Sequence, residues 1–148
     1  MEKINEVEIL IVEDSIDDAN LTIRALVKNN IVNSIYHVRD GAEALDFIFT
    51  RGDYSSRSNM AKPKLILLDL KMPKVNGVQV LEKIKSHPDT KTIPVVILTS
   101  SQEDPDIKKC YELGANSYIT KPVEFEGFVK AVKDLGYYWM MLNNFNLK

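Results

Sequence analysis

The chain has little of what several classes of protein require. It contains one cysteine, Cys110, among 148 residues, which excludes an internal disulfide and a multi-cysteine metal site. No apolar run approaches the ~20 residues needed to cross a bilayer, and the acidic N-terminus lacks the apolar core of a secretion signal. The formal net charge of −2 gives no electrostatic reason to expect nucleic acid or an acidic membrane as a partner. We therefore expect a cytoplasmic protein.

The composition favours an ordinary globular fold. Hydrophobic residues make up 45% of the chain and charged residues 27%, which excludes disordered and fibrous classes. No linker, repeat or low-complexity tract interrupts it, so we expect a single domain over residues 1–148 without an effector domain. The two histidines, His37 and His87, have no partner at metal-ligand spacing, and we interpret both as incidental.

Short apolar runs alternate with amphipathic helical patterns along the chain. The runs occupy residues 8–12, 34–38, 65–68, 94–98 and 117–120, and the helical patterns occupy 17–27, 42–49, 77–85, 104–113 and 124–142. Continuous apolar runs are typical of strands buried on both faces of a parallel sheet. Five strands alternating with five helices predict a doubly wound α/β fold with right-handed crossovers and an extended C-terminal helix.

A polar segment over residues 50–64 separates the second helical pattern from the third strand. Its length is unusual for a connection in a compact domain. We expect an extended helix-to-strand loop at the sheet edge away from the site, where it would tune a partner surface rather than take part in chemistry. The tripeptide Arg51-Gly52-Asp53 within it matches a short sequence motif by chance, and we assign it no function in a protein that we expect to be cytoplasmic.

Polar side chains follow four of the five strands directly. They are Glu13 and Asp14 after the first strand, Asp69 after the third, Thr99 and Ser100 after the fourth, and Lys121 after the fifth. Because the carboxyl ends of parallel strands share one edge, where open α/β sheets place their ligand sites, we expect these side chains to meet there. Taken singly, each could be a cap or turn residue, and that is how we interpret Ser15, Asp17 and Asp40.

The expected cluster suits the transfer of a phosphoryl group. Two carboxylates ~4 Å apart repel by ~4 kcal/mol at an effective dielectric constant of 20, so three of them need a counter-charge. Lys121 supplies one, and a hard cation would supply the rest. Oxygen ligands without nearby cysteine or histidine favour Mg²⁺. With the Thr99 hydroxyl and the Lys121 ammonium, the edge could hold a phosphoryl group carried on an aspartate.

Four motifs stand in order at these strand ends. They are Ile-Leu-Ile-Val-Glu13-Asp14-Ser, Leu-Leu-Asp69-Leu-Lys71-Met-Pro73-Lys-Val-Asn-Gly77, Val-Ile-Leu-Thr99-Ser100 and Gly114-Ala-Asn-Ser-Tyr118-Ile-Thr-Lys121-Pro122. Over nearly its whole length the chain resembles the receiver domain of two-component response regulators. The resemblance implies a flavodoxin-like strand order 2-1-3-4-5. The polar segment over residues 50–64 resembles that of single-domain regulators serving phytochrome-type sensor histidine kinases.

The resemblance also implies a role for each matching residue. Asp69 would accept a phosphoryl group from a kinase phosphohistidine. Asp14, Asp69 and the main-chain carbonyl of Lys71 would bind Mg²⁺ directly, and Glu13 would act through metal-bound water.

The remaining matched positions concern the switch. Lys121 would pair with the phosphoryl oxygens and would precede a cis bond to Pro122. Thr99 would hydrogen-bond the phosphoryl group, and Tyr118 would then turn inward and reshape a partner surface, although an ordinary amphipathic strand residue explains Tyr118 nearly as well. Lys71 and Ser100 occupy positions that help to set the dephosphorylation rate.

The last helical pattern carries an apolar stripe with a repeat of about 3.5 residues. Its members are Phe125, Phe128, Val132, Leu135, Trp139 and Leu142. Aromatic residues and methionine are enriched in interface cores, so we expect a homodimer through this helix and its neighbours. The alternative is that the segment folds back over its own domain.

Three further functions compete with a phosphorylation switch. A Mg²⁺-dependent phosphohydrolase with an aspartyl-phosphate intermediate would need a second aspartate two residues after the nucleophile, where this chain has Lys71. A stand-alone phosphorelay intermediate would use the same site. A nucleotide or flavin binder would need a glycine-rich loop after the first strand, where Glu13 and Asp14 would repel phosphate. We therefore expect a switch rather than an enzyme.

Overall fold

The computed structural model describes residues 7–28, 34–57, 62–72, 75–100 and 104–133. These residues form a five-stranded parallel sheet in the order β2-β1-β3-β4-β5. The strands are β1 (Ile9–Val12), β2 (Ile35–Val38), β3 (Leu65–Asp69), β4 (Val95–Thr99) and β5 (Ser117–Thr120). The α-helices are α1 (Ile16–Lys28), α2 (Gly41–Ile48), α3 (Gly77–Ser86), α4 (Asp106–Glu112) and α5 (Phe125–Lys133). The predicted fold class and strand order are confirmed.

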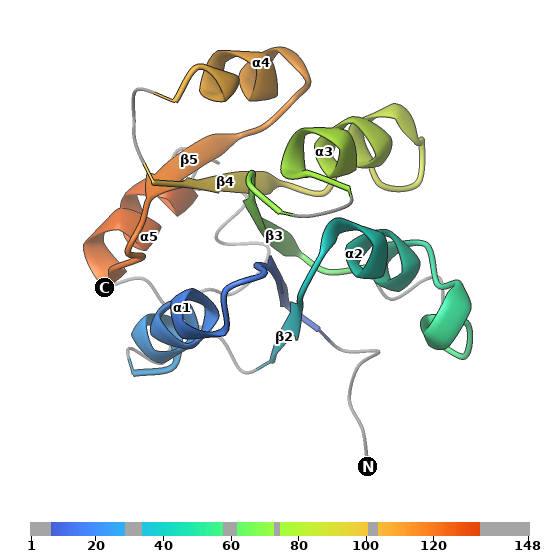
Figure 1. Ribbon diagram of the computed structural model, residues 1–148, viewed down its shortest axis with the longest axis horizontal. Coiled ribbons are helices and arrows are strands. Elements are labelled where there is room, and N and C mark those ends of the chain that lie inside the picture. The colour runs from blue at the N-terminus through green and yellow to red at the C-terminus, as the bar shows by residue number, and fades with distance from the viewer. Residues whose placement is uncertain (1–6, 29–33, 58–61, 73–74, 101–103, 134–148) are drawn as a thin grey trace.

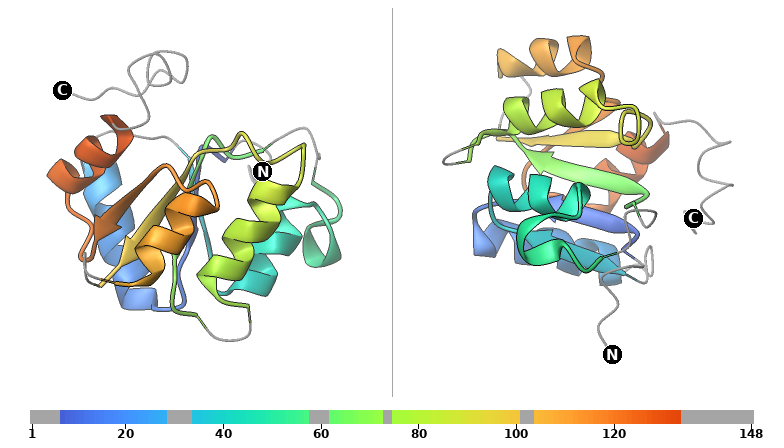
Figure 2. Two further views of the ribbon diagram at one scale, coloured as in Figure 1. Left: turned by 90° about the horizontal axis from the view of Figure 1, so that it is seen from above. Right: turned by 90° about the vertical axis from the view of Figure 1, so that its right-hand side faces the viewer.

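Helices cover both faces of the sheet, as Figures 1 and 2 show. α1 and α5 lie on one face, and α2, α3 and α4 lie on the other. Side chains alternate between the two layers, so that Ile9 and Ile11 pack in the core under α1 and α5, whereas Leu10 and Val12 pack under α2 and α3. β1, β3 and β4 are buried along their whole length. Their continuous apolar runs follow from this double burial.

Side-chain caps begin several of the helices. Ser15 Oγ accepts a hydrogen bond from the Asp18 backbone at the start of α1, and Asp40 caps α2 by accepting from the Glu43 backbone at 2.8 Å. Asn76 and Gln79 form a reciprocal capping box at the start of α3. The interpretation of Ser15 and Asp40 as caps is confirmed.

The described part of the connection from α2 to β3 includes regular structure. It contains a 3₁₀ helix, η2 (Gly52–Tyr54), that the sequence patterns did not indicate. Tyr54 is buried and packs edge-on against Phe47, and the buried Arg57 guanidinium lies 3.7 Å from the centre of the Phe47 ring. The connection leads to the start of β3, at the sheet edge opposite the strands' carboxyl ends.

Element ends differ from the predicted ones by a residue or two. β3 extends to Asp69, so the strand itself carries this aspartate. α5 is described up to Lys133, and the predicted continuation to residue 142 lies outside the described residues. Within the described residues, no helix has the length and apolar character needed to span a membrane.

Candidate functional site

A pocket of about 130 Å³ opens where the carboxyl ends of β1, β3, β4 and β5 meet. We call it the acidic pocket. Its lining residues are Glu13, Asp14, Ser15, Asp18, Asp69, Leu70, Lys71, Leu98, Thr99, Ser100, Asp104 and Lys121. Every site residue predicted from the sequence except Tyr118 is among them. The topology therefore brings together side chains as far apart in sequence as Glu13 and Lys121, which form an ion pair.

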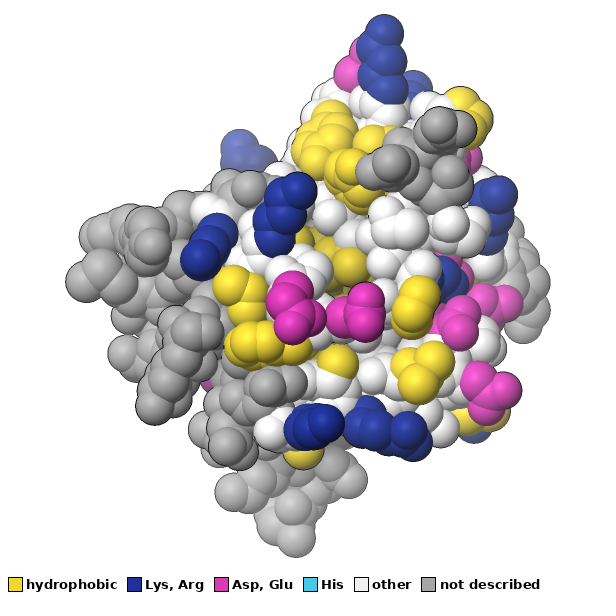
Figure 3. All heavy atoms as spheres, turned by 90° about the vertical axis from the view of Figure 1, so that its left-hand side faces the viewer, with side chains coloured by type: hydrophobic (Ala, Val, Ile, Leu, Met, Phe, Trp, Pro, Cys, Tyr) yellow, Lys and Arg dark blue, Asp and Glu magenta, His cyan; other side chains and the backbone are white. Residues whose placement is uncertain are grey.

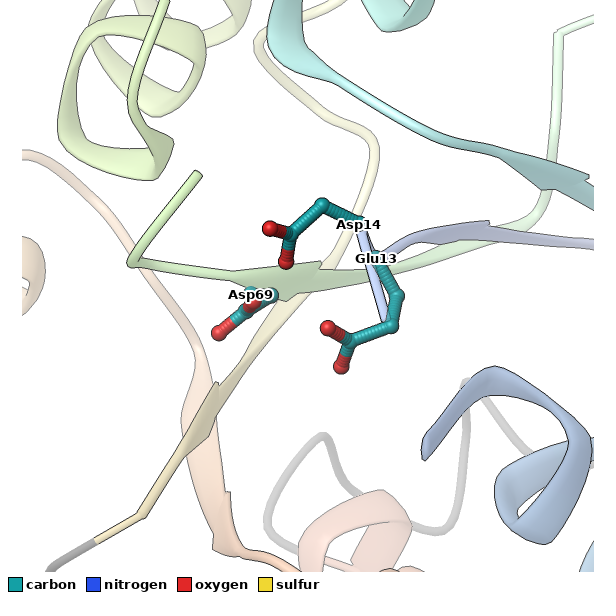
Figure 4. Close-up of side chains that lie close together, drawn as sticks. All are labelled: Glu13, Asp14 and Asp69. Carbon is teal, nitrogen blue, oxygen red and sulfur yellow. The ribbon is translucent and has the colours of Figure 1, made fainter. Parts of the chain in front are cut away.

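Three carboxylates form the centre of this pocket. Glu13 and Asp14 come from the end of β1 and Asp69 from the end of β3 (Figure 4). One oxygen of each lies within 4.8 Å of the others. Glu13 and Asp69 are buried, with exposed fractions of 1% and 4%, whereas Asp14 is exposed. Two of the three negative charges are therefore held in a poorly solvated place, where repulsion between them is strong.

The ionisation of the carboxyl groups reflects this environment. The pKa of Glu13 is raised from 4.5 to about 7, chiefly by burial and also by the hydrogen bond and charge of Asp69, against the opposing effect of Lys121. Burial also raises the pKa of Asp69, although Glu13, Lys121 and the Lys71 backbone oppose this. The two groups thus compete to ionise, and the site favours a bound positive charge.

Lys121 forms ion pairs with three carboxylates of the acidic pocket. Its Nζ lies 3.1 Å from Glu13 Oε1, 3.2 Å from Asp18 Oδ2 and 3.5 Å from Asp69 Oδ1. Burial works to lower the pKa of Lys121, but the charges of Asp69 and Glu13 outweigh it and the net pKa is raised. The ammonium is therefore charged and shared among three carboxylates. Asp18, in the first turn of α1, is not among the site residues predicted from the sequence.

The fourth strand contributes a hydroxyl that already has a partner. Thr99 is buried, and its Oγ1 donates to Asp104 Oδ2 at 3.3 Å. Ser100 is exposed at the pocket rim. The Lys71 backbone N–H donates to Asp69 Oδ1 at 3.4 Å, so the segment after β3 directs a donor at the central carboxylate.

Gly77 allows α3 to start against the end of β3. Its backbone N–H donates to the Leu70 carbonyl at 2.9 Å. A Cβ atom at this position would lie 2.4 Å from the carbonyl oxygen of Asp69 and 2.6 Å from Leu70 Cα, closer than such atoms can approach. Only glycine fits here, so the loop that carries Asp69 is packed tightly against α3.

This arrangement matches a known family. The response regulator receiver domain family matches residues 9–133. The chain belongs to this family. Response regulator Rcp1 of Synechocystis sp. is 40% identical to this receiver over 132 residues, which cover 89% of the chain and 88% of Rcp1.

Solved structures of phytochrome response regulators are similar to this receiver. Bacteriophytochrome response regulator RtBRR shares 51% identity at a TM-score of 0.82, over 88% of this chain and 78% of that one. Phosphorylated cyanobacterial phytochrome response regulator RcpA shares 39% at 0.73, over 90% and 94%. The Mn²⁺-bound form of Rcp1 shares 38% at 0.72, over 95% and 97%. The predicted resemblance to response regulators, with phytochrome-associated relatives, is confirmed.

The residues of this receiver fit a divalent cation. The donor set consists of carboxylate oxygens without sulfur or imidazole, which is the preference of hard cations. Acidic side chains outnumber lysines five to two around the pocket, and burial raises the pKa of both Glu13 and Asp69, so their charged forms are disfavoured without a counter-charge. A bound cation would relieve this excess, so the chemistry of the donor set agrees with the metal-bound relative.

Tyr118 lies apart from the acidic pocket. It is half-buried on β5 and packs beside the core under α3 and α4. It lines a larger pocket of about 310 Å³ between α4, β5 and α5, together with Tyr111, Pro122 and Lys130. That pocket is larger than the acidic one but holds no metal-ligand cluster among the described residues, so the chemistry belongs to the smaller pocket. The Lys121–Pro122 bond is cis, as predicted.

Proposed function

We propose that this receiver domain accepts a phosphoryl group on Asp69 from a sensor histidine kinase and then changes its partner surface. The observation that carries the proposal is the imbalance of charge in the acidic pocket. Acidic side chains outnumber lysines five to two in its lining, Lys121 is ion-paired with three of the carboxylates, and Glu13 and Asp69 are buried. A structural ion pair would not need this excess, whereas a site for a cation and a transferred phosphoryl group does.

Mg²⁺ is the cation that we assign to the site. Asp14, Asp69 and the main-chain carbonyl of Lys71 would hold it, with Glu13 acting through bound water. Hard cations of this size prefer one or two carboxylates together with phosphate oxygens and water. When bound, it would neutralise charge on the phosphoryl oxygens. The Mn²⁺-bound form of the relative Rcp1 supports a divalent cation in this family.

Asp69 is the group that attacks phosphorus. As a bond forms between its carboxylate oxygen and phosphorus, the phosphorus–nitrogen bond of the kinase phosphohistidine breaks, and the leaving nitrogen keeps the electron pair. Lys121, already 3.5 Å from Asp69 Oδ1, would pair with a phosphoryl oxygen. Because Asp69 is buried, the reacting carboxylate is poorly solvated. The hydrogen bond from the Lys71 backbone N–H orients this carboxylate.

Thr99 couples the phosphoryl group to the rest of the domain. Its hydroxyl now donates to Asp104 at the start of the α4 region. To donate to a phosphoryl oxygen it would leave Asp104, and this exchange would alter the segment that leads into α4. Tyr118, on the neighbouring strand, would then turn inward beside α4. Ser100 and Lys71, at the pocket rim, would set how fast water removes the phosphoryl group.

The kinase partner that we propose is phytochrome-type. The support comes from the relatives, since RtBRR and RcpA are both described as response regulators of phytochromes. A kinase must cover the acidic pocket to deliver its phosphoryl group. The half-exposed side chain of Ile16, directly after the pocket residue Ser15, offers an apolar contact at the rim.

Homodimerisation is the proposed output. In the described part of the predicted stripe, Phe128 and Val132 are buried and Phe125 is half-buried in the receiver's own core. A dimer would therefore use residues after Lys133 and exposed side chains of other elements. Figure 3 shows hydrophobic side chains exposed among charged ones on the side of the molecule where α1 and α5 lie. Large exposed hydrophobic residues include Leu21 and Val27 of α1.

The test is incubation with acetyl phosphate and Mg²⁺, followed by intact mass and light scattering. We expect a gain of one phosphoryl group in the wild type and in Asp53→Asn, an exposed carboxylate in η2, but not in Asp69→Asn. A change in molar mass on phosphorylation would support dimerisation as the output. An unchanged molar mass in fully phosphorylated protein would contradict it. Labelling of Asp69→Asn equal to the wild type would overturn the assignment of Asp69.

The alternatives differ in what happens to the phosphoryl group. A phosphohydrolase would release phosphate from an external phosphomonoester with turnover, and Lys71 stands where such an enzyme would need its acid–base aspartate. A phosphorelay intermediate would pass the group on to a second histidine protein. We expect neither phosphate release from added phosphomonoesters nor dependence of the association change on a second protein. Faster transfer from a phytochrome-type kinase than from an unrelated histidine kinase would support the proposed partner.

A further inference from the structure

His37 reaches from the edge strand β2 to the segment that carries two acidic residues. Its Nε2 lies 2.7 Å from the backbone carbonyl oxygen of Glu13. A carbonyl oxygen can only accept a hydrogen bond, so Nε2 carries the hydrogen and donates it. The ring is partly buried beside this contact. The sequence pattern had given this histidine no role, because the two residues are 24 positions apart.

The acceptor of this bond belongs to the peptide group that precedes Asp14. Because a peptide group is planar, its carbonyl oxygen, its nitrogen and the next Cα move together. A donor that fixes the Glu13 carbonyl therefore also fixes the position of Asp14 Cα and the direction of the Asp14 N–Cα bond. Asp14 itself is exposed and has no strand pairing to orient it, since β1 ends at Val12.

β2 holds the Glu13 backbone from both sides. The Glu13 N–H donates to the Val38 carbonyl at 3.1 Å, one residue after His37. The Glu13 side chain is held independently, by the Ser15 backbone N–H at 3.2 Å and by Lys121 Nζ at 3.1 Å. The contacts from β2 thus fix the main chain at Glu13 without using the carboxylates of Glu13 and Asp14, which line the pocket.

We propose that His37 is a positioning residue for the cation site, acting through the Glu13–Asp14 peptide group. The inference rests on the proposed function, since it assumes that Asp14 binds the cation. Residues that orient metal ligands through hydrogen bonds commonly change metal affinity by about tenfold or more when they are replaced. His37 would act in this way without touching the cation or the phosphoryl group.

The test compares replacements that keep or remove the donor. His37→Gln places an amide N–H near the position of Nε2, whereas His37→Leu fills space without a donor. His87, exposed after α3 and outside the acidic pocket, provides the matched control as His87→Gln and His87→Leu. For each protein, the rate of phosphorylation by acetyl phosphate is measured against Mg²⁺ concentration, Mn²⁺ binding is measured by calorimetry, and unfolding is followed by thermal melting.

The expected result separates positioning from packing. His37→Leu should need about tenfold more Mg²⁺ for half-maximal rate and bind Mn²⁺ about tenfold more weakly, with a maximal rate within about threefold of the wild type. His37→Gln should restore both values to within about threefold, and the His87 variants should match the wild type. Unchanged cation dependence in His37→Leu would overturn the inference, and so would equal losses in both His37 variants. A wild type that neither binds the cation nor takes up phosphate would instead overturn the proposed function, and the role of His37 with it.

Discussion

Two regions of this receiver bury polar groups, and they do so in opposite ways. Around η2, the Tyr54 hydroxyl donates to Glu43 at 2.6 Å and lies 2.9 Å from the Tyr36 hydroxyl, and the Arg57 guanidinium donates to the Phe47 carbonyl. We call this the η2 network. In the acidic pocket, by contrast, acidic side chains outnumber lysines five to two, and three carboxylates share the Lys121 ammonium. The η2 network pairs its groups within the chain, whereas the acidic pocket keeps an excess of one charge.

The contrast separates structural from functional polarity. A buried hydrogen-bonded network whose members satisfy one another stabilises a unique packing. A buried excess of charge lowers stability and is kept where a ligand of opposite charge restores the balance. Both regions hold buried polar side chains, so burial alone does not identify the site. The sign and balance of the charge do.

The largest effect is expected from neutralising the centre of the acidic pocket. Asp69→Asn should lower phosphorylation by acetyl phosphate at least ~100-fold, because the nucleophile is lost. It should also raise the melting temperature of the metal-free protein. Burial raises the pKa of Asp69, so the folded state disfavours its charged form, and a neutral amide removes that penalty. A lower melting temperature for Asp69→Asn in chelator would contradict the claim that the charge of Asp69 destabilises the metal-free protein.

The opposite outcome is expected in the η2 network. Tyr54→Phe removes the hydroxyl that bridges Glu43 and Tyr36, and should lower the free energy of unfolding by about 1–3 kcal/mol. Phosphorylation should stay within about twofold of the wild type, since η2 lies at the other edge of the sheet. Denaturant unfolding and intact mass measure the two effects, with Asp53→Asn as the exposed control in the same short helix. A tenfold loss of phosphorylation in Tyr54→Phe would contradict the distinction between a structural η2 network and a functional acidic pocket.

A smaller effect is expected from pH in the metal-free protein. The folded-state pKa of Glu13 is raised from 4.5 to about 7. Between these two pH values, the Glu13 carboxyl group is therefore protonated in the folded state but ionised in the unfolded state. The stability from this group is present below pH ~4.5 and is lost as the pH rises through about 7. Melting temperatures in chelator should fall over that range, and Glu13→Gln should flatten the fall. Added Mg²⁺ should stabilise the wild type more at pH 7.5 than at pH 5. Equal stabilisation at both values would count against the prediction.

The smallest effect concerns a buried group in neither region. Cys110 of α4 is 1% exposed, and burial, with the charges of Asp106 and Asp104, raises the pKa of its thiol to about 11. The thiolate is the reactive form, so alkylation of the native protein at pH 8 should be slow and should become fast on unfolding. Intact mass against time measures it. Rapid labelling of the native protein would show that α4 opens readily.

Much of the fold and of the site could be predicted because both depend on local patterns. The apolar runs of β1, β3 and β4 are continuous because these strands are buried on both faces. Asp69 and Lys121 were found because each directly follows such a run, and a parallel sheet brings these positions to one edge. This inference requires only that the strands are parallel.

What the sequence did not indicate depends on pairing between distant segments. His37 was interpreted as incidental, since nothing in the spacing shows that β2 places it against Glu13. Asp18 was not predicted as a site residue, because its contact with Lys121 depends on how α1 packs near β5. Tyr54 and Arg57 lie in a polar stretch without periodicity, so their burial could not be inferred from it. The structure was needed for each of these.

The most direct test of the central claim is to map the modified residue. After phosphorylation with acetyl phosphate and Mg²⁺, borohydride reduces an acyl phosphate on aspartate to homoserine, and trypsin should release residues 65–71, in which Asp69 is the only acidic side chain. We expect homoserine at position 69 and unmodified Glu13 and Asp14. Homoserine at position 14, or an unreduced phosphoryl group on a hydroxyl such as Thr99, would contradict it.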